Sequence, residues 1–198
     1  MSNTKNILIV GVGGQGIILA SEVMASVALS AGYDVKQSEV HGMAQRGGSV
    51  SSHVRYGDRV DSPTIAAGRA DVLLSFELLE SLRWTHFLSP KGSVIVNSQR
   101  IDPMPVASGK AEYPSDIETR LRRNGTSVYK IDGQSLAEQA GHIKAVNVAL
   151  LGVLSRRLEF DEHVWLDAIR NRVPAKTIDI NFKAFHLGRE AVSVLENV

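Results

Sequence analysis

Apolar and polar positions divide the chain into short apolar runs and longer stretches with a helical period. Residues 6–10, NILIV, form a continuous apolar run that is typical of a strand buried on both faces. Apolar side chains then recur at steps of three and one, which predicts a helix with one buried face that stops at Gly32. Residues 33–38, YDVKQS, have the pattern of a second strand, so we expect a βαβ unit with parallel strands and a right-handed crossover. The expected helical stripe consists of Ala20, Val23, Met24, Val27, Ala28 and Ala31.

The middle of the chain continues this alternation of strands and helices. Residues 77–88 have helical spacing, whereas residues 99–114 contain three prolines and are expected to form an irregular surface connection. The further segments with strand patterns are residues 50–57, 70–76, 93–98 and 127–131.

Three helices are expected toward the C-terminus. The first should place Gly152 at a close approach to another element. Asp161 is the expected N-cap of the second, where Phe160 and Trp165 have the spacing of a hydrophobic staple. The third should cover about residues 181–196. Their buried faces are expected to contain Ile143, Val146, Leu150, Val153, Leu154, Phe182, Phe185 and Val192.

This order of elements predicts the fold class. It favours an α/β fold, Rossmann-like and doubly wound, with a mostly parallel sheet, helices on both faces and three C-terminal helices. In such a sheet, ligands bind at the carboxyl ends of the strands. The chain has 198 residues, of which 43% are hydrophobic, so we expect a single domain over residues 1–198.

Charge and cysteine content exclude several classes of function. The 22 Lys and Arg residues nearly balance the 21 Asp and Glu residues, so a net charge of +1 offers no footprint for nucleic acid or for a membrane surface. No signal peptide is evident and no apolar run approaches the roughly 20 residues that span a bilayer, so a cytoplasmic protein is expected. Without cysteine, the chain cannot hold an iron–sulfur cluster through its own thiolates. The histidines show neither HExxH nor HxH spacing, so no metal site is expected.

A glycine-rich turn follows the first strand. Gly11, Gly13 and Gly16 match G-x-G-x-x-G between a predicted strand and a predicted helix, which is the context in which this spacing binds phosphate. Unpaired N–H groups and the positive end of the helix dipole can hold an anion there. Alternatively, the glycines serve only a tight turn and close packing of the helix on the strand.

The same turn also fits a nicotinamide enzyme. Glu39, near the end of the second strand, is where such a protein would bind the ribose. However, no tyrosine is followed four residues later by lysine, and no length remains for a separate substrate domain. A stand-alone NAD(P)-binding Rossmann-type oxidoreductase therefore stays as the alternative, and a regulatory module that binds a nucleotide or acyl-coenzyme A is a third.

A second glycine-rich segment, EVHGMAQRGGSV, covers residues 39–50. Its glycines allow close approach of the backbone to a ligand, Arg46 offers a planar group for phosphate or carboxylate, and His41 can transfer protons near neutral pH. Alternatively, Arg46 pairs with Glu39 and the glycines only shape a long loop. Because this segment follows the second strand, we expect it to form one surface with the glycine-rich turn.

Six segments, taken in order, resemble those of one family. The sequence is similar to the smaller (beta) subunit of indolepyruvate ferredoxin oxidoreductase, and to the gamma subunit or domain of 2-oxoacid:ferredoxin oxidoreductases. The resemblance runs from about residue 6 to residue 191, and the histidine-containing segment is typical of the indolepyruvate branch. The segments are GVGGQG (11–16), EVHGMAQRGGSV (39–50), SP (62–63), ADVLLSFE (70–77), VIVN (94–97) and KAVNVALLG (144–152).

The resemblance implies one subunit of a larger enzyme. That enzyme would decarboxylate an aryl 2-oxoacid such as indole-3-pyruvate, transfer the acyl group to coenzyme A and pass electrons to ferredoxin. Thiamine diphosphate and 4Fe-4S clusters would be bound mainly by a large alpha subunit, in agreement with the absence of cysteine here. This chain would bind no cofactor alone, would cover the thiamine or coenzyme A site of its partner with the glycine edge, and could form a homodimer when isolated.

The motifs define the candidate site residues. His41 and Arg46 are the expected catalytic residues. Asn147 is polar but buried by helical phase, which suits either a ligand contact or a core amide bonded to the backbone. Gly141 and His142 stand where the family pattern has Gly-Asn, so that amide contact is in doubt. The expected cofactor-binding residues are Gly11, Gly13, Gly14, Gln15, Gly16, Glu39, Gly42, Gln45, Gly47, Gly48 and Asn147.

Overall fold

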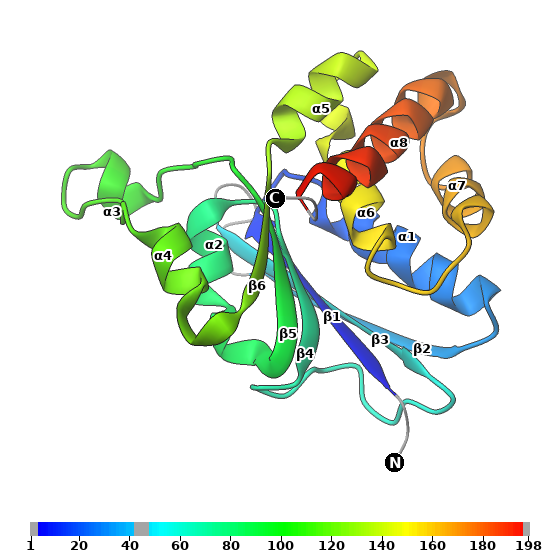
Figure 1. The fold of residues 1–198 in the computed structure, drawn as a ribbon, viewed down its shortest axis with the longest axis horizontal. Helices are drawn as coiled ribbons and strands as arrows, with labels where there is room; N and C mark the ends of the chain where they lie inside the picture. The colour runs from blue at the N-terminus through cyan, green and yellow to red at the C-terminus, as the bar shows by residue number, and fades with distance from the viewer. Residues whose placement is uncertain (1–3, 42–47, 196–198) are drawn as a thin grey trace.

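A six-stranded mixed sheet forms the centre of the protein. The computed structural model describes residues 4–41 and 48–195. The strand order is β2-β3-β1-β4-β5-β6, in which β1, β4, β5 and β6 are parallel and β3 runs antiparallel to both of its neighbours (Figure 1). The predicted α/β class with a mostly parallel sheet is confirmed. The strands are β1 (Lys5–Val12), β2 (Asp34–His41), β3 (Ser49–Gly57), β4 (Ala70–Ser75), β5 (Leu88–Asn97) and β6 (Ser127–Ile131).

Helices and short 3-10 turns connect these strands and follow the last of them. The α-helices are α1 (Ile17–Ser30), α2 (Leu78–Arg83), α3 (Met104–Ala107), α4 (Ile117–Leu121), α5 (Gly133–Ala140), α6 (Val146–Ser155), α7 (Glu162–Arg170) and α8 (Ile178–Leu195). The 3-10 turns are η1 (Thr85–Phe87), η2 (Arg123–Gly125), η3 (Ile143–Ala145) and η4 (Ala175–Thr177). None of the helices in the described part of the chain is both long and apolar enough to cross a membrane.

Alternate residues of β1 show that helices cover both faces of the sheet. Ile7 and Ile9 pack in a core with α1, α6, α7 and α8, whereas Leu8 and Val10 pack in a second core with α2 and α4. All four side chains are fully buried. Such an uninterrupted buried run is what a central parallel strand requires, and the predicted helices on both faces are confirmed.

The position of β3 corrects the expected βαβ unit. β1 and β2 point in the same direction but are not neighbours, because Ser52 of β3 lies opposite both Ile9 and Glu39. The segment 42–48 is too short for a crossover to a parallel neighbour, which needs a dozen or more residues, so β3 returns antiparallel to β2. In this position between two strands, the polar side chains of Ser52 and His53 are buried.

The three helices expected at the C-terminal end are α6, α7 and α8. Gly152 lies where α6 crosses α8, and a Cβ atom there would overlap the carbonyl oxygen of Phe185. Phe160 and Trp165 are in contact, with ring centroids 6.3 Å apart, as expected for the staple. Asp161 is the N-cap residue of α7, but its side chain makes no capping hydrogen bond with the described backbone.

Some elements differ from the sequence-based expectation. The helix expected over residues 77–88 is divided into α2 and η1, and the connection 99–114 contains α3. α4 and α5 were not predicted, because helices of five and eight residues are too short to show a clear apolar period. Ala31 and Ile143 are exposed rather than buried, since each lies just outside the α-helix that its stripe predicted.

Candidate functional site

The glycine-rich turn connects β1 to α1 at the carboxyl end of the parallel strands. Gly14 and Gly16 have φ angles of +101° and +84°, which glycine adopts without steric strain. The N–H of Gly13 donates to the carbonyl oxygen of Gly48 at 2.9 Å. The turn therefore meets the end of the second glycine-rich segment, and the expected convergence of the two is confirmed at this point.

The side chain of Gln15 holds the turn against the rest of the sheet. Its Oε1 accepts from the N–H of Val12 at 2.7 Å. Its Nε2 donates to the carbonyl oxygen of Phe76 at 2.9 Å and to Oε1 of Gln99 at 2.8 Å. The amide of Gln15 is thus engaged within the chain, and Gln15 supports the site by fixing the turn beside the end of β4.

Asn147 lies directly against the glycine-rich turn. It is 7% exposed, and its Oδ1 accepts from the N–H of Val148 at 2.9 Å in the first turn of α6. A Cβ atom on Gly16 would be 2.6 Å from Nδ2 of Asn147, so a larger residue here would displace that amide. Among the described residues, Nδ2 has no acceptor within hydrogen-bonding distance. One end of the amide is therefore bonded to the backbone, and the other is available to a ligand.

A cavity of about 700 Å³ opens beside this contact. Its lining consists mainly of the glycine-rich turn, Asn147, η3, η4 and the start of α8. The charged or titratable lining groups among the described residues are His142, Lys144 and Lys176, without any carboxylate. Together with the N-terminal end of α1, these lysines produce a positive potential in the cavity, which favours an anionic ligand.

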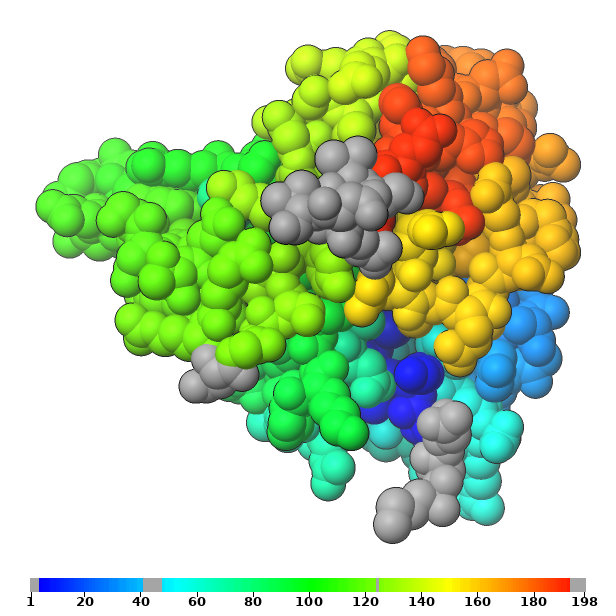
Figure 2. All heavy atoms as spheres, viewed as in Figure 1, coloured from blue at the N-terminus to red at the C-terminus, as the bar shows by residue number. Residues whose placement is uncertain are grey.

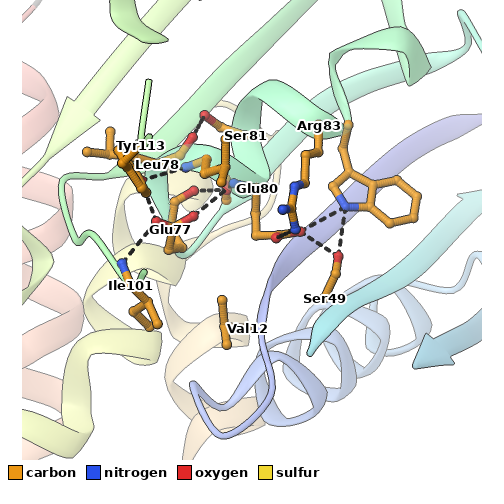
Figure 3. A network of polar contacts seen from close by, with 12 residues as sticks. Val12, Ser49, Glu77, Leu78, Glu80, Ser81, Arg83, Ile101 and Tyr113 are labelled. Atoms are coloured by element: carbon orange, nitrogen blue, oxygen red, sulfur yellow. Dashed lines mark hydrogen bonds and ion pairs between the residues drawn. The ribbon is translucent and has the colours of Figure 1, made fainter. Parts of the chain in front are cut away.

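Glu77, a buried carboxylate at the N-cap of α2, organises the region beside the turn (Figure 3). The residue is 1% exposed. Its Oε2 accepts a hydrogen bond from the N–H of Glu80. Its Oε1 accepts from the N–H of Ile101 and from the hydroxyl of Tyr113. Burial, with a smaller contribution from the bond to Glu77, raises the pKa of Tyr113, so the phenol stays protonated and donates. Glu77 thus joins α2 to the segment that follows β5.

A second buried carboxylate, Glu80, fixes the start of β3. It is 2% exposed; its Oε2 accepts from the hydroxyl of Ser49 and from Nε1 of Trp84, and its Oε1 accepts from Arg83 at 2.7 Å (Figure 3). Ser49 directly follows Gly48, whose carbonyl accepts from the glycine-rich turn. Glu80 therefore holds the strand beside the contact between the two glycine-rich segments.

Residues 6–191 match a protein family described as pyruvate ferredoxin/flavodoxin oxidoreductase. The chain belongs to this oxidoreductase family. It is 43% identical to indolepyruvate oxidoreductase subunit IorB of Pyrococcus horikoshii, over 98% of both chains. It is 30% identical to ketoisovalerate oxidoreductase subunit VorA of Methanothermobacter marburgensis, over 92% of this chain but 35% of VorA.

The fold of this oxidoreductase family member also occurs inside a longer chain of known structure. That structure is 2-oxoglutarate:ferredoxin oxidoreductase from Magnetococcus marinus, bound to 2-oxoglutarate, coenzyme A and succinyl-CoA. The two share a TM-score of 0.74 at 19% identity, over 96% of this chain and 31% of the other. The likeness shows a common fold.

The structure brings together one part of the predicted site of this oxidoreductase. The glycine-rich turn contacts both Gly48 and Asn147. The backbone of His41 pairs with Val50 at the end of β2, but its side chain lies outside the described part of the chain. Outside the described residues lie Gly42, Gln45, Arg46 and Gly47. The catalytic assignments of His41 and Arg46, and the pairing of Arg46 with Glu39, therefore stay predictions.

Glu39 does not stand where a dinucleotide-binding fold would have its acidic residue. In that fold the second strand is the direct neighbour of the first, so its carboxylate reaches the ribose beside the glycine-rich turn. Here β3 separates β1 from β2, and Glu39 lies one strand farther from the turn. This topology disfavours the alternative of a stand-alone NAD(P)-binding oxidoreductase.

Four side chains of the candidate site had not been singled out from the sequence. Lys144 lies in the segment KAVNVALLG, three residues before Asn147. That spacing places the two side chains on one helical face, so it could have indicated Lys144 as a site residue. Glu77 and Glu80 are three residues apart among apolar positions, a pattern that predicts a shared and partly buried helix face. Lys176 carries no such local signal, because only the tertiary fold brings η4 to the same cavity as η3.

Proposed function

We propose that this chain is the subunit without redox centres in a thiamine diphosphate-dependent 2-oxoacid:ferredoxin oxidoreductase of the cytoplasm, with indolepyruvate as the substrate. The complex would convert an aryl 2-oxoacid to its acyl-CoA derivative, release CO₂ and pass electrons to ferredoxin. The supporting observation for the substrate is the 43% identity to an indolepyruvate oxidoreductase subunit over 98% of both chains. The histidine-containing segment at residues 39–50 supports the same branch of the family.

The redox chemistry is proposed to reside on a large alpha subunit. The chain has no cysteine to ligate a 4Fe-4S cluster. In the described part of the chain, no group of three or more His, Asp or Glu side chains is arranged to hold a metal ion. When bound by the partner, thiamine diphosphate would supply carbanion chemistry at the 2-oxo carbon. This chain would contribute binding, orientation and exclusion of water.

The cavity beside the glycine-rich turn is the proposed contribution of this chain to ligand binding. Its positive lining and the free Nδ2 of Asn147 suit an anionic ligand that has hydrogen-bond acceptors. The phosphates of coenzyme A have both properties. The structure of Magnetococcus marinus 2-oxoglutarate:ferredoxin oxidoreductase contains coenzyme A, which agrees with this ligand class. The geometry of the cavity beside Gly16 is the observation on which the proposal depends.

Reconstitution with the large subunit tests the proposal. We expect the isolated chain to show no oxidoreductase activity and no iron absorbance. Co-expression with a cysteine-rich alpha subunit should yield a complex that reduces viologen with indolepyruvate and coenzyme A, and more slowly with pyruvate or 2-oxoglutarate. Failure of the two chains to associate would reject the assignment to a complex. Faster turnover of pyruvate would reject only the aryl substrate.

The NAD(P)-binding alternative has one specific feature in its favour, the glycine-rich turn that opens α1. Calorimetry of the isolated chain with NADH and NADPH distinguishes it. Because β3 separates Glu39 from the turn, we expect no binding at millimolar cofactor. Saturable binding of either dinucleotide would favour the alternative, or a regulatory nucleotide-binding module if no turnover accompanied it.

A further inference from the structure

The side chain of Gln99 presents a hydrogen-bond donor at the wall of the cavity. Gln99 lies two residues after the end of β5, is half-buried and belongs to the cavity lining. Its Oε1 accepts from Nε2 of Gln15 at 2.8 Å. In the described part of the chain, its Nε2 has no acceptor within hydrogen-bonding distance. One end of the amide is therefore held by the protein, and the other is a donor without a partner.

The backbone determines which end of each amide is the donor. The N–H of Val12 can only donate, so the atom of Gln15 that meets it at 2.7 Å is oxygen. The other end of Gln15 is then Nε2, which donates to the carbonyl oxygen of Phe76 and needs an acceptor from Gln99. A flipped Gln99 would bring two NH₂ groups together. Its Oε1 therefore faces Gln15, and its Nε2 is directed away from Gln15.

Hydrogen bonds on both sides hold the backbone at Gln99 in place. Its carbonyl oxygen accepts from the N–H of Leu78 at 3.0 Å. Two residues later, the N–H of Ile101 and the hydroxyl of Tyr113 both donate to Glu77 (Figure 3). The chain then leads into α3, which projects to the left of the sheet in Figures 1 and 2. Gln99 thus lies at the fixed base of this projecting segment, so its side chain is oriented before a ligand binds.

Other donors in the cavity lining also lack acceptors among the described residues. Nδ2 of Asn147 has none, although its Oδ1 accepts from the backbone. Lys144 and Lys176 form no ion pair with a described carboxylate. A ligand that brings oxygen acceptors breaks no hydrogen bond within the protein at these groups. Because the amides are already oriented, little conformational entropy is lost when such a ligand binds.

We infer that Gln99 is a ligand-binding residue, whose Nε2 donates to an acceptor oxygen of the ligand in the cavity. This inference rests on the proposed function, in which that ligand is coenzyme A. Coenzyme A has two kinds of acceptor, the phosphate oxygens and the amide carbonyls of its pantetheine portion, and both suit an amide donor. Gln15 orients Gln99 and does not itself need to contact the ligand. The inference adds to the candidate site a residue that the sequence motifs did not include.

Gln99→Glu separates the donor from the contact with Gln15. A carboxylate keeps an oxygen for Nε2 of Gln15 but has no N–H for the ligand. We expect the Kd of coenzyme A for the complex, measured by calorimetry, to rise by about fivefold or more, as for the loss of one hydrogen bond. Gln134→Glu is the matched control, since it places the same charge at another amide of the cavity lining. It should raise the Kd less.

Gln99→Met removes the donor without adding a charge, and it is the second variant if Gln99→Glu does not fold. It should also raise the Kd, while Gln15 keeps its hydrogen bond to Phe76. Thermal unfolding of the isolated chains should occur at nearly the wild-type temperature, so weaker binding reports the ligand contact and not the fold.

The same measurements with pantetheine identify the acceptor. A higher Kd for both pantetheine and coenzyme A places the acceptor among the amide carbonyls. A higher Kd for coenzyme A alone places it among the phosphates. Either result supports the inference, whereas an unchanged Kd of both ligands in the two Gln99 variants overturns it.

The remaining outcomes separate this inference from the proposed function. If the wild-type complex binds no coenzyme A, the proposed ligand is wrong and the inference fails with it. If Gln99→Glu raises the Kd no more than Gln134→Glu does, the added charge accounts for the effect, so the inference is wrong and the proposed function stands. If Gln99→Met weakens binding while Gln99→Glu binds like the wild type, Gln99 only supports Gln15, and the inference is likewise overturned.

Discussion

The N–H of Gly13 donates a 2.9 Å hydrogen bond to the carbonyl oxygen of Gly48. This bond joins two segments that are 35 positions apart in the sequence, one after β1 and one before β3. Two supports hold it in place, because Gln15 ties the turn to β4 and Glu80 binds Ser49 at the start of β3. The two glycine-rich segments therefore act as one binding edge, and substitutions that disturb either support should be measurable.

Gly16→Ala should destabilise the protein and its ligand site together. Gly16 has φ of +84°, and a new Cβ atom would be 2.6 Å from Nδ2 of Asn147. We expect a loss of about 2–3 kcal/mol in the free energy of unfolding, measured by urea denaturation, because backbone strain and steric overlap add.

Gly14→Ala is the matched control for this substitution. Gly14 also has positive φ, +101°, but nothing lies within 4 Å of its added Cβ, so only the strain of about 1–2 kcal/mol is expected. Asn147→Ala in the Gly16→Ala background should recover part of the difference. If both glycine variants lost the same free energy of unfolding, and the double variant recovered none of it, the contact with Asn147 would not contribute to the effect of Gly16→Ala.

Glu80→Gln should destabilise β3 at its first residue. The carboxylate accepts from Ser49, Trp84 and Arg83, whereas an amide replaces one acceptor oxygen by a donor that faces other donors. We expect the free energy of unfolding to fall by about 1–3 kcal/mol in urea denaturation, as for a buried acceptor that is lost. Glu190→Gln, an exposed carboxylate on α8, should change stability little. Comparable effects of the two substitutions would contradict the role of Glu80.

His53 should make the folded state less stable as the pH falls. Its pKa is lowered, first by burial and second by Arg55, and its Nδ1 accepts from the N–H of Ile65. In the unfolded chain the pKa of histidine is about 6.5. The contribution of His53 to the free energy of unfolding is therefore present above that pH and is lost as the pH falls toward the lower pKa of the folded state.

Urea denaturation at pH 7 and pH 5 checks the sign of this effect. The free energy of unfolding of the wild type should fall between the two values by more than that of His53→Gln, whose side chain does not titrate. The quantity to compare is the change in the free energy of unfolding between pH 7 and pH 5, and not the absolute stability of the variant. An equal fall in both proteins would mean that His53 does not contribute.

Lys176→Gln should weaken the binding of coenzyme A to the complex. Among the described residues, Lys176 is one of two lysines that line the cavity beside the glycine-rich turn, and removal of its charge lowers the positive potential there. We expect the Kd, measured by calorimetry, to rise by about tenfold, which corresponds to about 1.4 kcal/mol. Higher ionic strength should reduce the difference between variant and wild type.

Two controls distinguish this effect from a general change of charge. Lys110→Gln removes an exposed lysine that follows α3, outside the cavity, and should leave the Kd unchanged. Pantetheine lacks the phosphates of coenzyme A, so its binding should be insensitive to Lys176→Gln. If Lys110→Gln and Lys176→Gln weaken coenzyme A equally, the cavity is not the phosphate site.

Local patterns were enough to predict the main strand and helices of the candidate site, although not η3 and η4. The apolar run of β1, the glycine-rich turn and the amphipathic α1 are each encoded within a few residues, and so are α6, α7 and α8. Gly152 was also predicted to allow close approach, because a glycine inside an apolar helical face indicates a backbone contact. Periodicity and spacing are properties of neighbouring residues, so they can be read without the fold.

The tertiary structure decided which of these segments became neighbours. Strand pairing is a choice among partners distant in sequence, which is why β3 rather than β2 lies beside β1, and why Glu39 is displaced from the turn. The cavity and the buried Glu80 likewise depend on contacts between segments far apart along the chain. The sequence alone determined the elements and the glycine motifs, whereas the arrangement of charges around them arose only when the sheet and helices packed together.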